Sequence, residues 1–170
     1  MSALLGIDLG ERRIGVALAE DADRAARPLV TIRRHRDVAI DAADLRALVE
    51  SNGAGEIVVG LPLEAAGQEG PQAAMTRTWV AAIELLLAMT GVTVTFQDER
   101  LSSHVAEGRL GPMRRGRSGG PPSRHQRDEY RARVDREAAA IILQDALDSR
   151  RDRDRAGTAH TPPPTLETSP

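Results

Sequence analysis

Short apolar runs separated by tight turns dominate the beginning of the chain. Leu4, Leu5 and Ile7 supply an apolar run that ends at a turn beginning with Gly10, and the next apolar residues alternate with small ones up to residue 18. This period of two predicts two strands joined by a tight turn, and a third strand follows over 28–33. We expect these three strands to form an antiparallel meander.

The middle and end of the chain alternate between helical and strand patterns. The expected strands occupy 57–59 and 92–97, and the expected helices occupy about 37–51, 72–89, 102–110 and 128–149. The strand at 57–59 is continuously apolar, which is typical of a parallel strand covered on both faces. The order of elements therefore predicts an α/β protein with a mixed five-stranded sheet and helices on both faces.

Two segments lack apolar periodicity. The stretch 111–127 is rich in Gly, Pro, Ser and Arg, so we expect a mobile loop there. Beyond residue 150 an Arg/Asp alternation, which can extend the last helix by a turn or two, leads into a sequence rich in Thr and Pro. That sequence holds too little apolar surface to offset the entropy of ordering. We therefore expect one domain over 1–150 and a disordered tail over 151–170.

Composition narrows the chemistry and the partners. The chain has no cysteine, which excludes disulfides, thiolate metal sites and a cysteine nucleophile. Its longest apolar run is far too short to span a bilayer and no signal-type segment opens it, so we expect a cytoplasmic protein with no membrane partner. All 23 basic residues are arginine, and between Arg109 and Arg136 nine of them stand against three acids. This cluster favours a polyanionic partner, although a solvated Arg-rich loop is the alternative.

Three acidic positions lie where a carboxylate needs a compensating partner. Asp8 ends an apolar strand, the pair Asp98-Glu99 ends another, and Asp135 lies on the apolar stripe of the last helix. The ordinary alternatives are a turn cap, a helix-entry turn and a salt bridge, respectively. If the three positions meet at one sheet edge, their oxygen ligands suit Mg²⁺ or Mn²⁺.

Taken together, these motifs resemble the YqgF family, whose members are described as Holliday junction resolvases and as pre-16S ribosomal RNA nucleases. The motifs occur in the family's order over about residues 3–149: Gly6-Ile7-Asp8-Leu9-Gly10 with Arg13-Ile14-Gly15-Val16-Ala17, Gly60-Leu61-Pro62, Asp98-Glu99-Arg100-Leu101-Ser102, and Asp135 with Ala138-Ala139 and Ile142-Leu143. The resemblance implies a ribonuclease H-like fold and metal-dependent hydrolysis of phosphodiester bonds. It implies a role in processing the 5′ end of 16S rRNA or in resolving Holliday junctions.

The resemblance also assigns the catalytic acids. Asp8 is expected to bridge two divalent ions about 3.5–4 Å apart, while Glu99 (with Asp98 as the alternative) and Asp135 each hold one. Two departures from the family pattern stand out. The loop before the last helix is longer and richer in Gly and Pro, and Ala138 stands where related resolvases carry a second acid.

Arginines are the expected contacts to nucleic acid. We expect Arg13 or Arg100 near the scissile phosphate, although each could equally pair with a neighbouring acid. We expect Arg114, Arg115 and Arg117 to bind the flanking phosphates. The expected partner is then an RNA precursor or branched DNA. Whether the protein forms a homodimer stays open.

Two other functions stay open at this point. One is a catalytically silent nucleic-acid-binding scaffold. The other is an ATPase of the actin or sugar-kinase type, which this chain fits poorly because it lacks a second phosphate loop and a second domain.

Overall fold

A computed structural model describes residues 2–64, 67–99, 102–113 and 121–158 of the chain. Its strands are β1 (Ala3–Leu9), β2 (Arg13–Ala19), β3 (Arg27–Arg33), β4 (Ala54–Pro62) and β5 (Thr93–Glu99). Its helices are α1 (Val38–Asn52), α2 (Pro71–Leu87) followed by the 3₁₀ turn η1 (Ala88–Thr90), α3 (Ser102–Leu110) and α4 (Arg124–Thr158).

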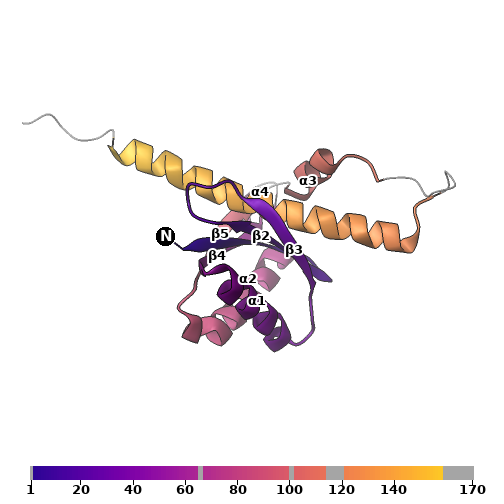
Figure 1. The fold of residues 1–170 in the computed structure, drawn as a ribbon, viewed down its shortest axis with the longest axis horizontal. Helices are drawn as coiled ribbons and strands as arrows, with labels where there is room; N and C mark the ends of the chain where they lie inside the picture. The colour runs from indigo at the N-terminus through magenta and orange to yellow at the C-terminus, as the bar shows by residue number, and fades with distance from the viewer. Residues whose placement is uncertain (1, 65–66, 100–101, 114–120, 159–170) are drawn as a thin grey trace, which may run out of the picture.

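The five strands form one mixed sheet in the order β3-β2-β1-β4-β5. The first three strands pair antiparallel, and β4 and β5 join them in parallel. Helices α1 and α2 cover one face of the sheet, and α4 crosses the other face with α3 beside it (Figure 1). The mixed five-stranded sheet with helices on both faces is therefore confirmed.

Local sequence signals explain where two of the helices begin and end. Asp37 caps α1 because its Oδ1 accepts a hydrogen bond from the Ala39 N–H at 3.0 Å. Gly53 then ends α1 in the left-handed conformation, with φ of 62°. Pro71 opens α2, where its missing N–H costs nothing, and Gly91 ends the following turn with φ of 72°.

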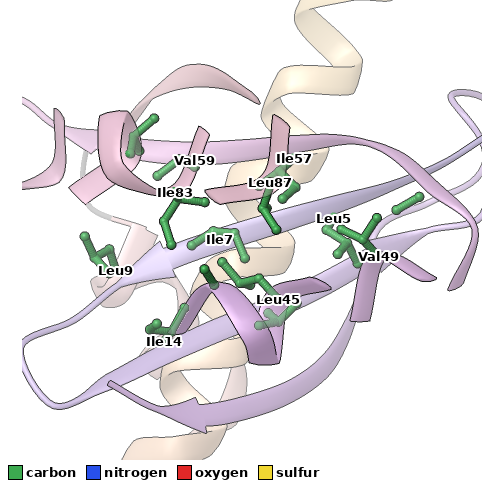
Figure 2. Close-up of a cluster of buried hydrophobic side chains, with 14 of the residues drawn as sticks. Leu5, Ile7, Leu9, Ile14, Leu45, Val49, Ile57, Val59, Ile83 and Leu87 are labelled. Atoms are coloured by element: carbon green, nitrogen blue, oxygen red, sulfur yellow. The ribbon is translucent and has the colours of Figure 1, made fainter. Parts of the chain in front are cut away.

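The face covered by α1 and α2 holds the main hydrophobic core (Figure 2). From β1 it takes Leu5, Ile7 and Leu9, all 5% exposed or less. Leu45 of α1 and Ile83 of α2 pack against them. Because side chains alternate along a strand, the residues between these three in β1 must point to the opposite face.

The buried stripe of α2 differs from the expected one. The helical spacing of the sequence predicts one apolar stripe with Met75, Trp79, Ile83, Leu86 and Leu87. In the structure Met75 and Leu86 are 40% and 38% exposed, whereas Thr76 and Val80 are buried beside Trp79. By length and composition α2 with η1 could cross a membrane, but a core helix passes the same test, and part of this one lies against the sheet. The absence of a membrane partner stays a prediction.

On the opposite face, α4 approaches the sheet closely because two strand residues have no side chain. A Cβ atom at Gly6 would lie 2.6 Å from Leu143 Cβ, and a Cβ atom at Gly15 would lie 2.0 Å from the Asp135 carbonyl oxygen. Ala139 and Leu143 of α4 then pack into a second hydrophobic cluster with Leu4. The spacing of Ala138 from Asp135 predicts that it lies on the sheet-facing stripe of this helix, but it packs with Ala106 of α3 instead.

Helix α4 is longer than the sequence pattern predicted. It begins at Arg124 rather than near 128, because Ser123 and Gln126 form a reciprocal capping box: each side chain accepts a hydrogen bond from the other's N–H, at 3.2 and 2.8 Å. At its other end it continues to Thr158, about two and a half turns past residue 149 and more than the one or two turns expected. Residues 151–158, which were expected in the disordered tail, are therefore helical. For residues 159–170, which lie outside the described part of the chain, the expected disorder stays a prediction.

Candidate active site

The alternation of side chains along β5 separates Asp98 from Glu99. Val94 packs into the core under α1 and α2, and Phe96 lies beneath the guanidinium of Arg77 from α2. Asp98 shares that phase, whereas Glu99 has the opposite phase and points to the α4 face. Asp8 of β1 also points to the α4 face, since Ile7 and Leu9 on either side of it are in the core. The geometry thus brings together Asp8 and Glu99 and leaves Asp98 on the other face.

Gly60 of β4 provides the space between these two carboxylates. The parallel register pairs Ile7 with Val59, which sets Asp8 beside Gly60, and β5 lies on the far side of β4. A Cβ atom at Gly60 would lie 2.6 Å from Glu99 Oε2. The Glu99 side chain therefore crosses β4 at its one residue without a side chain there, and any larger residue would push it away from Asp8.

Asp135 approaches from α4 and completes the group. Its backbone is packed against Gly15, so the start of the sheet-contacting part of the helix is fixed next to β2. Its Oδ2 accepts a hydrogen bond from Arg13 Nε at 2.5 Å, in a part-buried ion pair. Of the alternatives expected for Arg13, the structure shows the pairing with a neighbouring acid.

The pKa of Asp8 reflects its burial and the proximity of the other two acids. Burial is the main cause that raises the pKa of its carboxyl, and the negative charges of Glu99 and Asp135 add to it. Together they raise the pKa of Asp8 from 3.8 to about 8. Three elements far apart in the chain therefore concentrate negative charge at one point, and a nearby positive charge would relieve it.

The donor set fits a hard divalent cation, because carboxylate oxygens are the ligands that Mg²⁺ and Mn²⁺ prefer. Within the described ranges, no three side chains of the types His, Cys, Asp or Glu are already close enough to hold a metal ion as a group. The ion pair with Arg13 occupies one oxygen of Asp135. A cation bound by all three acids would thus have to compete with this guanidinium.

A cleft of about 510 Å³ lies beside the acids, between the β1–β2 turn and α4. The turn contributes Gly10, Glu11, Arg12 and Arg13, and the helix contributes Asp128, Arg131 and Asp135. Residues four and seven positions before Asp135 share its helix face, so Arg131 and Asp128 point to the same cleft. Of the three acids, Asp135 lines this cleft, so the cleft gives a polymer access to the group from the side of Asp135.

The arginines expected at the nucleic acid are only partly described. Arg13 lies in the cleft, whereas Arg100, Arg114, Arg115 and Arg117 lie outside the described residues. Sequence reasoning missed a second group at the end of β3. A second hollow of about 510 Å³ is lined by Glu11, Arg12, Arg33, Arg34, His35 and Arg36. The signal that could have found it is the run Arg33-Arg34-His35-Arg36, directly after a predicted strand.

Comparisons with known proteins show the family of this chain. The family model RuvX, described as Holliday junction resolvase, matches residues 2–149. A protein of Anaeromyxobacter sp. (strain Fw109-5) is 47% identical over 86% of this chain and 96% of its own length, and one of Chloroflexus aggregans is 42% identical over 87% and 94%. Both carry the name "Putative pre-16S rRNA nuclease".

Among solved structures, RuvC of T. thermophilus in complex with a Holliday junction substrate matches with a TM-score of 0.49 and 18% identity, over 89% of this chain and 96% of that one. The family model and the curated relatives cover nearly all of the domain that we expected over 1–150. The chain therefore belongs to the RuvX family, the one that its motifs identified as YqgF, and it is a hydrolase of the nuclease class.

Proposed function

We propose that this nuclease hydrolyses phosphodiester bonds of precursor 16S rRNA with a divalent cation held by Asp8, Glu99 and Asp135. The observation that carries the proposal is the placement of these three acids on the α4 face, where burial and the charges of the other two raise the pKa of Asp8. The choice of substrate follows the name of the relatives at 47% and 42% identity. The cation is Mg²⁺ or Mn²⁺, and the expected compartment is the cytoplasm.

Asp8, Glu99 and Arg13 each have a distinct part in the proposed mechanism. When bound, the divalent cation supplies activation of water and neutralisation of charge on the phosphate. Asp8 lies between Glu99 and Asp135 and must lose its proton to act as a ligand, so cation binding releases a proton near neutral pH. Glu99 reaches its place only across Gly60. Arg13 holds Asp135 in orientation while the cation is absent.

The cleft would place a scissile phosphate beside Asp135. Arg12 and Arg13 lie on one wall and Arg131 on the other, interspersed with Glu11 and Asp128, so a phosphodiester strand would meet a guanidinium group on each wall. Such contacts position a strand without reading its bases. Selection of the cleavage position would then come from the shape of the precursor or from proteins bound to it.

The test compares three labelled substrates side by side: precursor 16S rRNA, unrelated single-stranded RNA and a four-way DNA junction. Wild-type protein and the Asp8→Asn variant are assayed with Mn²⁺, with Mg²⁺ and with chelator. We expect cleavage of the precursor by wild type only, and only with a cation. Binding without cleavage by wild type would instead support the silent scaffold, and cleavage of the junction alone would replace the proposed substrate.

A further inference from the structure

The cluster Arg12, Arg33 and Arg36 lies outside the group of acids and outside the Arg109–Arg136 segment. All three side chains are exposed. In the part of the chain that the structure describes, none of them makes a side-chain hydrogen bond or an ion pair. Three exposed guanidinium groups without acidic partners repel one another, and a polyanion would relieve that repulsion.

The segment that carries this cluster is held rigidly against the end of the catalytic strand. Arg34 donates from its backbone N–H to the Arg12 carbonyl at 3.0 Å and from Nη1 to the Gly10 carbonyl at 2.9 Å. These two bonds tie the end of β3 to the turn that begins two residues after Asp8. Arg34 is thus a positioning residue, and its neighbours Arg33 and Arg36 are the ones left to bind.

A buried carboxylate fixes the same segment from the other side. Asp41 of α1 is 0% exposed and accepts from the His35 N–H at 2.9 Å, while its second oxygen accepts from Trp79 Nε1 at 3.1 Å. The His35 ring also lies 3.1 Å from the first oxygen. The backbone of this segment is therefore fixed by the core, and ligand binding needs to order only the exposed arginine side chains.

The register of the sheet points the cluster toward the acids. Arg33 pairs directly with Arg13 across the β2–β3 ladder, so the two side chains leave the sheet on the same face, next to each other. Arg13 contacts Asp135, and Arg12 lines both hollows. A continuous row of guanidinium groups thus leads from Asp135 over Arg13 to Arg33 and the β3 end.

Three exposed acids lie near the row, one of which is Asp128 of α4 in the cleft with Arg12 and Arg13. Glu11 lines both hollows, and Asp37 follows Arg36 in the chain. Asp37 is engaged as the cap of α1 through its bond to the Ala39 N–H, and Asp41 is bonded to His35 and Trp79. The balance of the hollow at the β3 end remains positive, with four arginines against Glu11.

We propose that Arg33 and Arg36, with Arg12, bind the phosphates of the nucleic-acid strand that flanks the scissile bond, so that the strand runs from the acids across the β1–β2 turn to the end of β3. This inference rests on the proposed function, since it extends the same cleft. The recognised chemistry is the phosphodiester backbone, common to RNA and DNA. It provides affinity and register on the enzyme but no base specificity.

The test is a binding measurement in the Asp8→Asn background, so that no cleavage takes place. The affinity for a labelled single-stranded RNA is titrated against salt, and a four-way DNA junction is the second arm. The double variant Arg33→Ala/Arg36→Ala is compared with a matched control, Arg24→Ala/Arg153→Ala. The control removes the same charge from two exposed side chains at the opposite end of the sheet.

Each phosphate contact contributes about 0.7 to the slope of log affinity against log salt on single strands and about 0.9 on duplex. We expect the double variant to reduce the slope by about one to one and a half units on RNA and to bind about tenfold or more weakly at low salt, whereas the control leaves both unchanged. Arg33→Lys/Arg36→Lys should keep the slope. Thermal unfolding of the Arg33/Arg36 variants should match wild type, since these side chains make no hydrogen bond or ion pair among the described residues. The control loses only the exposed contacts of Arg24 with Asp21 and of Arg153 with the Ser149 carbonyl, so its unfolding should change little.

Comparing RNA with the DNA junction identifies which polymer binds. The slope of log affinity against log salt decides whether the proposal holds. A smaller slope on RNA, on the junction or on both supports the strand path and says which backbone takes it. An unchanged slope on both, or an equal loss in the control, overturns it. These results do not depend on cleavage, so a wild-type protein that fails to cleave refutes the proposed function and leaves this measurement decisive.

Discussion

The two faces of the sheet are built from the same strands but follow opposite rules. On the α1/α2 face, β1 presents Leu5, Ile7 and Leu9 to a core of large branched side chains (Figure 2). On the α4 face the same strand presents Leu4, Gly6 and Asp8. Leu4 packs in the smaller hydrophobic cluster next to α4, but toward the end of β1 this face combines a missing side chain with a carboxylate.

The difference shows how this fold separates stability from chemistry. Buried apolar area on the first face stabilises the sheet, and this allows the second face to keep Asp8 at an unfavourable electrostatic potential. Because neighbouring residues in a strand point in opposite directions, substitutions one position apart should affect different properties.

Asp8→Asn should have the largest effect on catalysis and leave the stability of the α1/α2 face unchanged. The amide keeps the shape of the side chain but loses the charge that holds a divalent cation, so cleavage should fall by about a thousandfold or more. The fold should stay intact. Cleavage of precursor RNA and far-ultraviolet circular dichroism of the purified variant check both statements, and near-wild-type turnover would remove Asp8 from the mechanism.

Leu5→Ala should give the converse result. Leu5 is fully buried in the α1/α2 core, and the cavity left by its side chain should lower the free energy of unfolding by about 2–5 kcal/mol. Chemical denaturation measures the loss. Cleavage per folded molecule and its dependence on Mn²⁺ should match wild type, and a changed metal titration would show that the two faces are coupled.

The pair at the end of β5 tests the same separation with one chemical change at adjacent positions. Glu99→Gln should reduce cleavage by about a hundredfold or more, because it removes a charged ligand on the α4 face. Asp98→Asn should change it by about twofold at most, because this residue shares its phase with Phe96. Steady-state cleavage at several Mn²⁺ concentrations measures both effects. The reverse order would mean that Asp98, and not Glu99, points to the α4 face.

The carboxyl of Asp8 on the α4 face should make the free energy of unfolding depend on pH. With chelator present, the folded state holds the Asp8 proton up to a pKa of about 8, whereas the unfolded chain loses it near 3.8. Stability contributed by the protonated carboxyl is therefore complete below about pH 4 and is lost as the pH rises to about 8. Relative to Asp8→Asn, wild type should lose roughly 1–2 kcal/mol over this interval, less than the full shift because water still reaches the site. Urea denaturation at several pH values follows this difference, and parallel curves for the two proteins would contradict it.

Apart from the comparison variant Asp98→Asn, Arg13→Gln should have the smallest effect of the series. Removing the guanidinium beside Asp135 removes its competition with a cation, so half-saturation by Mn²⁺ should fall by up to about fivefold, as expected for a part-exposed ion pair. The metal titration of cleavage measures this shift. A higher Mn²⁺ requirement would instead mean that Arg13 helps to build the metal site.

Much of the fold follows from the sequence because its signals are local. The alternation over 14–18, the cap at Asp37 and the apolar strand at 57–59 each depend on neighbouring residues. The early start of α4 was also readable, since Ser123 and Gln126 stand at capping-box spacing. The pattern was obscured by the Gly/Pro-rich segment before it.

The site could be predicted only as far as its strand ends. The choice of Glu99 over Asp98 required the phase of β5, which Val94 fixes only once its core contact is known. The pair Arg13–Asp135 joins residues 122 positions apart, and no local signal chooses it over a phosphate contact. The nearness of Arg33 to Arg13 likewise depends on the β2–β3 register.

The contact of α4 with Gly6 and Gly15 has a consequence for insertions and deletions in this chain. The Asp135 carbonyl is seated on Gly15 and the Ala139 carbonyl would lie 2.7 Å from a Cβ atom at Gly6, so one turn of helix is matched to two fixed points of the sheet. A single residue added or removed between 135 and 139 would rotate the rest of the helix by about 100° and separate the acid from its partners. Residues added to the segment 111–122 would leave this match untouched. Length changes tolerated by functional variants should therefore concentrate before Ser123 and be absent from the turn between Asp135 and Ala139.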